Sequence, residues 1–165
     1  MKTINTITTT TSNAGLLARS LTLLLVAVTL GFGPQRVWAA DTVPFKGNAQ
    51  GAIVSATPAP GGVLVRVLAE GYATQLGKFS REEVLVLNPA TGSAVGTIVF
   101  TAANGDQLSG TVVAQFTSAT TLVATYTFTG GTGRFANATG EAQALLSTPD
   151  GVHFTVEFDG SVNKN

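Results

Sequence analysis

The feature that most constrains this chain is a regular alternation of β-rich segments and turn signals from Val43 to the C-terminus. The segments recur about every ten residues, a spacing typical of a β-sandwich or a β-barrel. This alternation predicts about eight strands. They are expected at residues 45–55, 63–74, 83–87, 94–102, 107–116, 120–129, 138–146 and from 152 onwards.

The turn sequences predict how neighbouring strands pair. Residues 57–62 combine two prolines with two glycines, and residues 88–92 run from Asn-Pro to Gly. Asn104-Gly105 is the strongest short hairpin signal in the chain. Because every connection is of hairpin length, sequential strands should pair antiparallel.

The strand patterns predict one dry face and one polar face. In the segment 120–129, Leu122, Ala124, Tyr126 and Phe128 share one face, and the other face is mostly threonine. Eight antiparallel strands in sequence leave two free edges unless the sheet closes, and closure removes edges that promote aggregation. We therefore predict an all-β fold, an eight-stranded antiparallel up-and-down barrel, with a two-sheet sandwich as the alternative. The interior of such a barrel holds side chains or one small ligand.

A glycine-rich segment joins two of the predicted strands. It contains Gly130, Gly131, Gly133, Phe135 and Gly140. Three glycines in four residues allow backbone conformations closed to other residues, and the phenylalanine offers a large apolar group to a core. The segment also matches the dinucleotide pattern G-x-G-x-x-A, but that pattern requires a helix after it, and strand-like segments surround it here. We interpret it as a structural corner.

This corner resembles the G-G-T-G-[KR]-F-x-x-A-x-G motif of dirigent proteins and the corresponding corner of allene oxide cyclases. Together with residues 100–106 it is similar to small exported bacterial proteins of unknown role. Dirigent proteins and allene oxide cyclases are eight-stranded barrels with an apolar cavity, so the resemblance implies the same scaffold here. In dirigent proteins the residue before the last glycine of the motif is commonly an arginine linked to the active cavity. Thr139 stands there in this chain, so the resemblance implies no active site.

The first 39 residues predict a signal peptide. Lys2 and Arg19 accompany a polar lead, an apolar run covers 21–30, and a Gly-Pro breaker precedes Ala39. The apolar run is shorter than the roughly 20 residues that span a bilayer, so release is favoured over a membrane anchor. We expect cleavage after Ala39, which leaves residues 40–165 as a single barrel domain, secreted or periplasmic and away from the membrane.

Composition excludes several classes of function. Without residues 1–39 the domain keeps six basic and nine acidic residues, a net charge of −3, and the basic residues are scattered singly. A nucleic-acid partner would require a basic patch, so none is expected. The chain has no cysteine, and therefore neither disulfides nor a thiolate metal site. No metal or cofactor is predicted, and the oligomeric state is left open.

Four side chains are predicted to contact a ligand: Tyr126, Phe128, Tyr72 and His153. A phenol that projects into a barrel can hydrogen-bond a ligand or act as an acid, although it can also bond a backbone carbonyl of the core. His153 is the only histidine, and strand alternation places it on the face opposite Phe154, where we favour a solvated position. No catalytic residue is identified.

Three functions are compatible with these observations. The favoured one is binding of a small apolar or phenolic ligand inside the barrel. The alternatives are a dirigent-like or allene oxide cyclase-like isomerase or cyclase, and a non-catalytic extracellular module with a filled interior. A cavity separates the first two from the third, and convergent polar groups with shifted pKa values would favour an enzyme.

Overall fold

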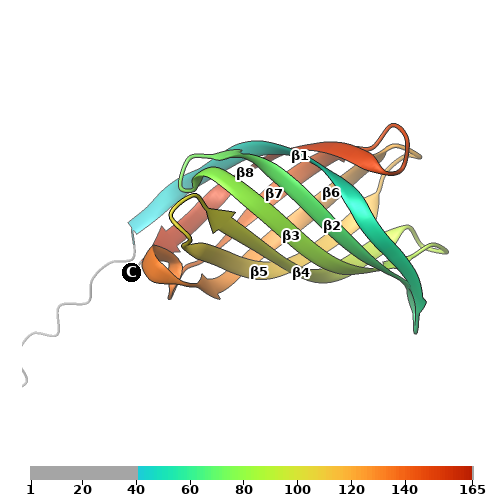
Figure 1. Cartoon of the computed structure of the whole chain (residues 1–165), viewed down its shortest axis with the longest axis horizontal. Helices are drawn as coiled ribbons and strands as arrows, with labels where there is room; N and C mark the ends of the chain where they lie inside the picture. The colour runs from blue at the N-terminus through green and yellow to red at the C-terminus, as the bar shows by residue number, and fades with distance from the viewer. Residues whose placement is uncertain (1–40, 165) are drawn as a thin grey trace, which may run out of the picture. The chain divides into compact units, whose positions relative to one another are not determined.

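The computed structural model describes residues 41–164, which form one closed antiparallel β-barrel (Figure 1). Its elements are β1 (Asp41–Ala59), β2 (Gly62–Ala73), β3 (Gly77–Asn88), β4 (Ser93–Ala102), β5 (Gln107–Phe116), β6 (Thr121–Gly131), the 3₁₀ turn η1 (Gly133–Phe135), β7 (Thr139–Ser147) and β8 (His153–Lys164). Each strand pairs with the next, and β1 pairs with β8. The predicted eight-stranded barrel is confirmed, whereas the alternative sandwich is wrong. The expected signal peptide lies outside the described residues.

Two strands are longer than the sequence pattern predicted. β1 runs past the end of β8: Ala52 pairs with His153, the Ile53 N–H donates to the Val152 carbonyl, and the residues from Ser55 onwards pair with β2 alone. This free edge tolerates Pro58, which has no N–H to donate. β3 begins at Gly77 rather than at residue 83, because Gly77 itself makes the turn with a φ of 66°. The longer β3 brings two more inward positions into the barrel.

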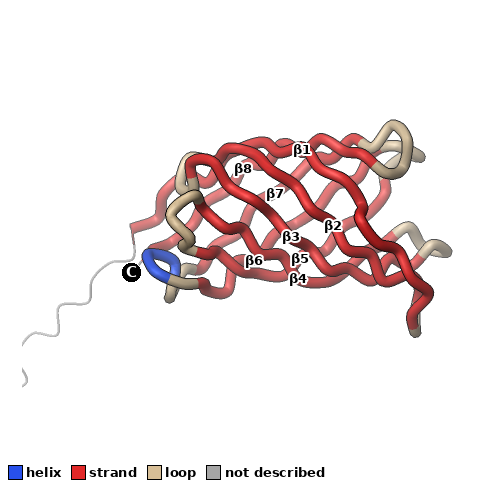
Figure 2. The backbone as a smooth tube through the Cα atoms, in the orientation of Figure 1, coloured by secondary structure: helices blue, strands red, loops and turns tan. Residues whose placement is uncertain are grey.

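The connections gather at the two ends of the barrel (Figure 2). The loops 74–76, 103–106 and 132–138 lie at one end, which we call the corner end. The loops 60–61, 89–92, 117–120 and 148–152 lie at the other end, the mouth end. This division follows from the antiparallel order, because consecutive hairpins alternate between ends.

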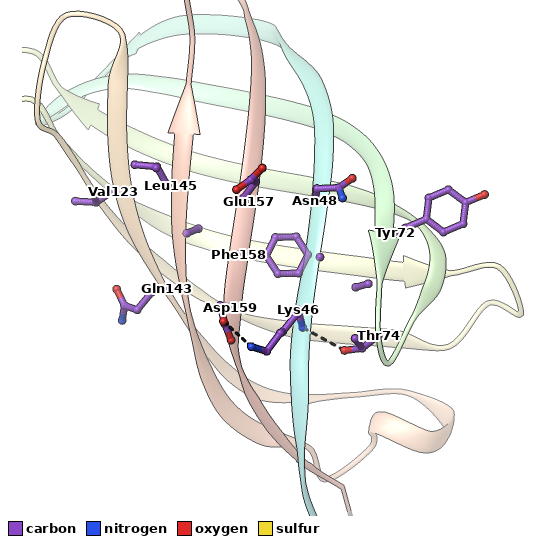
Figure 3. Close-up of a pocket in the computed structure, with 13 residues that line it drawn as sticks. Lys46, Asn48, Tyr72, Thr74, Val123, Gln143, Leu145, Glu157, Phe158 and Asp159 are labelled. Atoms are coloured by element: carbon purple, nitrogen blue, oxygen red, sulfur yellow. Dashed lines mark hydrogen bonds and ion pairs between the residues drawn. The ribbon is translucent and has the colours of Figure 1, made fainter.

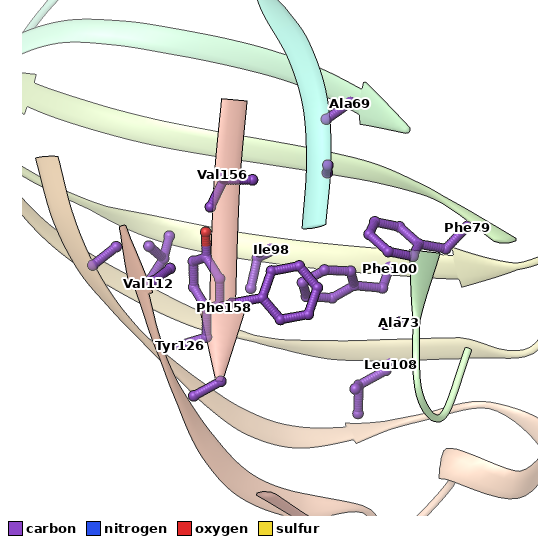
Figure 4. Close-up of a cluster of buried hydrophobic side chains, with 14 of the residues drawn as sticks. Ala69, Ala73, Phe79, Ile98, Phe100, Leu108, Val112, Tyr126, Val156 and Phe158 are labelled. Carbon is purple, nitrogen blue, oxygen red and sulfur yellow. The ribbon is translucent and has the colours of Figure 1, made fainter. Parts of the chain in front are cut away.

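Aromatic rings fill the interior towards the corner end (Figure 4). The ring centroid of Phe45 lies 4.9 Å from that of Phe128 and 5.2 Å from that of Phe158, and Phe100 packs edge-on against Tyr126 at 6.1 Å. Edge-to-face and offset contacts of this kind stabilise a core beyond simple burial. This half of the barrel is a packed core.

The glycine-rich corner covers the same end. Gly133 has a φ of 55°, and a Cβ there would lie 1.9 Å from the Asp106 carboxylate. The Thr132 hydroxyl accepts a hydrogen bond from the Gln107 N–H at 2.9 Å, and Arg134 donates to the Gln75 carbonyl at 3.1 Å. These contacts hold η1 in place, with its phenylalanine fully buried. The corner thus ties the β6–β7 connection to β5 and to the β2–β3 loop.

No helix among residues 41–164 is long and apolar enough to span a membrane.

Candidate functional site

A cavity of about 180 Å³ occupies the mouth end of the barrel interior. It is lined by Ile53, Val65, Val67, Glu83, Leu85, Leu87, Ala94, Phe116, Ala119, Leu122, Leu146, Thr148, Gly151, Val152 and Phe154. Val152 is 45% exposed, so the cavity reaches the surface at the β7–β8 loop. The barrel is therefore packed at one end and hollow at the other.

Glu83 is the charged residue in the wall of this cavity. β3 directs alternate side chains inward, and this alternation carries Phe79, Arg81, Glu83 and Leu85 into the barrel. Glu83 is only 4% exposed, and its Oε1 atom makes no hydrogen bond with any of the described residues. A buried acceptor without a donor is unfavourable and marks a position where a polar partner would be stabilised.

Arg81 lies deeper in the barrel, on the same face of β3. Its side chain is fully buried, and its Nη1 donates to the Tyr126 hydroxyl at 3.1 Å. Its Nη2 lies 3.3 Å from Glu83 Oε1, an ion-pair distance without hydrogen-bond geometry. The guanidinium also lies 5.3 Å from the centre of the Phe154 ring. Cation, carboxylate and phenol thus form one buried polar cluster between the aromatic core and the cavity.

Burial controls the protonation of this cluster. Desolvation raises the pKa of the Glu83 carboxyl above its usual value, and the opposing attraction of Arg81 is smaller. Burial likewise raises the pKa of the Tyr126 phenol, which stays neutral at physiological pH. Because a guanidinium only donates, the phenol oxygen is the acceptor, and its own proton is left for another acceptor.

The structure separates the four residues that the sequence predicted as ligand contacts. Tyr126 and Phe128 are buried in the interior, but neither lines the cavity, and only Tyr126 joins the polar cluster. Tyr72 is 63% exposed on the outer wall. His153 also faces outward, with its Nδ1 2.7 Å from the Asp150 carboxylate. That hydrogen bond, with others from backbone N–H groups, lowers the pKa of Asp150.

Sequence reasoning missed Arg81 and Glu83, although strand alternation could have located both. They share parity with Phe79, Leu85 and Leu87, which are apolar and point inward. The predicted strand begins at residue 83, so Arg81 lies outside it and Glu83 stands at its first position. Two opposite charges on the apolar face of one strand are the signal that indicates a buried pair.

No family model matches the chain, and no curated protein is similar in sequence. A solved structure of a pterocarpan synthase dirigent protein superposes on it with a TM-score of 0.57, over 77% of this chain and 88% of that one. The chain has the fold of a dirigent protein. Sequence identity over this dirigent-like barrel is 17%, so the similarity concerns the fold alone.

Proposed function

We propose that the dirigent-like barrel binds one small, largely apolar molecule in its mouth-end cavity, with a polar group of the ligand against Glu83. The observation that carries this proposal is the buried carboxylate in an otherwise almost wholly apolar wall. In small-molecule sites the apolar surface usually supplies the affinity, and a few polar groups fix the orientation of the ligand.

The volume limits the ligand to roughly one ring. An apolar cavity of about 150 Å³ accommodates a benzene-sized molecule. The cavity here measures about 180 Å³, so a single substituted ring or a short branched chain fits inside. A longer ligand would extend past Val152 to the surface.

Charge balance favours a neutral hydroxyl as the polar group. Arg81 and Glu83 together carry no net charge when both are ionised, and an ionised carboxylate only accepts hydrogen bonds. An alcohol or phenol donates to it and leaves the buried cluster neutral. A ligand carboxylate would be repelled by Glu83, and a ligand ammonium would add a buried charge.

Titration calorimetry with matched ring ligands tests this proposal. We expect p-cresol to bind more tightly than toluene, and 4-methylbenzoate not to bind. The replacement Glu83→Gln should weaken the binding of p-cresol about tenfold, because one charge-assisted hydrogen bond is lost. Ala94→Leu, which fills the cavity, should abolish binding of both neutral ligands. The proposal fails if neither neutral ligand binds the folded protein, if 4-methylbenzoate binds as tightly as p-cresol, or if Ala94→Leu leaves binding of the neutral ligands unchanged.

A second candidate is dirigent-like or allene oxide cyclase-like catalysis in the same cavity. The raised pKa of Glu83 favours it, because a carboxyl that titrates closer to neutral pH is a better proton acceptor and donor. Glu83→Gln separates the two candidates. If the protein is an enzyme, Glu83→Gln should still bind a hydroxylated ring substrate but no longer turn it over. If it is a binding protein, neither the unmodified protein nor Glu83→Gln should show turnover.

We also propose that the protein is exported, on the strength of the leader pattern in residues 1–39. Protein recovered from the medium or the periplasm should begin at Ala40. It should then contain no tryptophan, because Trp38 is the only one in the chain. An intact amino terminus on such material would contradict this proposal.

A further inference from the structure

A second hollow lies on the outer wall of the barrel, away from the cavity. It consists of three adjoining depressions of about 760, 780 and 500 Å³ over β1 and β8. The first two share Tyr72, Asn48 and Glu157, and the second and third share Gln50 and Thr155. We call this continuous surface the outer groove, and Figure 3 shows its first part.

Strand register arranges the side chains of the outer groove in rows. Tyr72 pairs with Asn48, Asn48 with Glu157, and Glu157 with Leu145, so one row crosses β2, β1, β8 and β7. Neighbouring strands are about 4.8 Å apart, which makes this row roughly 14 Å long. Along β8 the groove extends from Asp159 to His153, roughly 20 Å at strand rise.

The groove presents hydrogen-bonding groups around one exposed aromatic ring. Tyr72 is 63% exposed and points away from the barrel (Figure 3). The remaining lining mixes the exposed apolar side chains of Val123 and Leu145 with amides, hydroxyls and carboxylates, among them Asn48, Gln50, Gln143, Ser147, Thr155 and Glu157. Lys46 and Asp159 neutralise each other at 2.8 Å. Among residues 41–164, Glu70, Glu157 and Lys78 form no ion pair, so the groove carries a net charge of −1.

These properties exclude most classes of ligand. The negative excess disfavours polyanions, and the amides and carboxylates that flank Val123 and Leu145 interrupt the continuous apolar surface that a lipid chain requires. An extended peptide cannot add as a strand, because β1 and β8 are paired on both sides along the groove. An oligosaccharide fits the groove, because carboxylates and amides form hydrogen bonds with its hydroxyl groups. An exposed aromatic ring can also pack against the C–H face of a sugar.

We propose that the outer groove binds a neutral oligosaccharide, with Tyr72 as the stacking platform and with Asn48 and Glu157 as hydrogen-bonding partners. This site is independent of the cavity, because Tyr72 and Glu83 lie on opposite faces of the barrel wall.

Affinity electrophoresis in gels that contain soluble neutral polysaccharides tests this site, with xylan, mixed-linkage β-glucan and galactomannan as probes. We expect at least one of them to retard the protein. Tyr72→Ala should weaken that binding about tenfold, the scale of one aromatic contact, whereas Tyr72→Phe should retain it. Glu157→Gln should weaken it by a smaller factor.

Two controls keep the outcome specific. Val113→Ala, at a similarly exposed position outside the groove, and Glu83→Gln, in the cavity, should both bind polysaccharide like the unmodified protein. The proposal is overturned if no neutral polysaccharide retards the protein, if Tyr72→Ala binds unchanged, or if dextran sulfate is bound in preference. None of these results tests ligand binding in the cavity, so the outer-groove proposal can fail while the cavity proposal stands.

Discussion

At the scale of single residues, the Arg81–Glu83 pair is the most unusual feature of the barrel. Its charges are removed from water, and the 3.3 Å contact between them lacks hydrogen-bond geometry. The desolvation of such a pair commonly exceeds its mutual attraction. The raised pKa of Glu83 has the same origin. The pair is therefore expected to lower the free energy of unfolding.

A double-mutant cycle measured by urea unfolding at pH 7 tests this cost. Glu83→Leu leaves a buried guanidinium that cannot lose its proton, and we expect a loss of about 3–5 kcal/mol. Arg81→Met should cost less, because the remaining carboxyl can take up a proton. The double variant should be at least as stable as the unmodified protein. A double variant less stable than both single ones would contradict this account.

The pH dependence of stability follows from the same carboxyl. Because the pKa of Glu83 is raised in the folded state, the folded protein holds this proton more tightly than the unfolded chain. The stability that this bound proton contributes is complete below the ordinary glutamate pKa of about 4.3. It is lost as the pH rises through the pKa of Glu83 in the folded protein. We expect the unfolding free energy, relative to Glu83→Gln, to fall between pH 4 and pH 8. An increase in the unfolding free energy over that range would show that the attraction of Arg81 outweighs the desolvation of the Glu83 carboxyl.

At the scale of strands, alternation predicted the interior well wherever it was followed without interruption. The parity that places Val65 inside also places Tyr72 outside, and Tyr72 was singled out for its chemistry rather than for its parity. In β3 the predicted start at residue 83 left Arg81 outside the strand and Glu83 at its first position, although the strand begins at Gly77. The volume of the cavity could not be predicted, because it depends on how Ala94, Ala119 and their neighbours meet after closure.

Close contact between strands also depends on single glycines. A Cβ on Gly160 in β8 would lie 2.1 Å from the Glu141 carbonyl oxygen and 2.4 Å from the Ala142 Cα in β7. We expect Gly160→Ala to lower the unfolding free energy by about 1–3 kcal/mol, the usual cost of overpacking. Gly105→Ala is a matched control, because its Cβ would meet open space and only its backbone conformation is disfavoured. A smaller loss for Gly160→Ala than for Gly105→Ala, by chemical unfolding, would contradict the close packing.

At the scale of the whole molecule, closure divides the interior into a packed end and a hollow end. Aromatic rings and the glycine-rich corner fill the first, and the second ends in a cavity whose wall carries one buried carboxylate. The fold could be expected from the spacing of strands and turns, because hairpin-length connections restrict the pairing to sequential neighbours. The dirigent-like fold is shared with a protein of only 17% sequence identity, whereas the cavity is formed by side chains that are particular to this chain.

A crystal structure of the protein soaked with p-cresol tests the central claim most directly. We expect the ring inside the mouth-end cavity, in contact with Leu85 and Phe116, and the hydroxyl within hydrogen-bonding distance of a Glu83 carboxylate oxygen. A mouth end filled by its own side chains, or a ligand found only on the outer wall, would contradict the account.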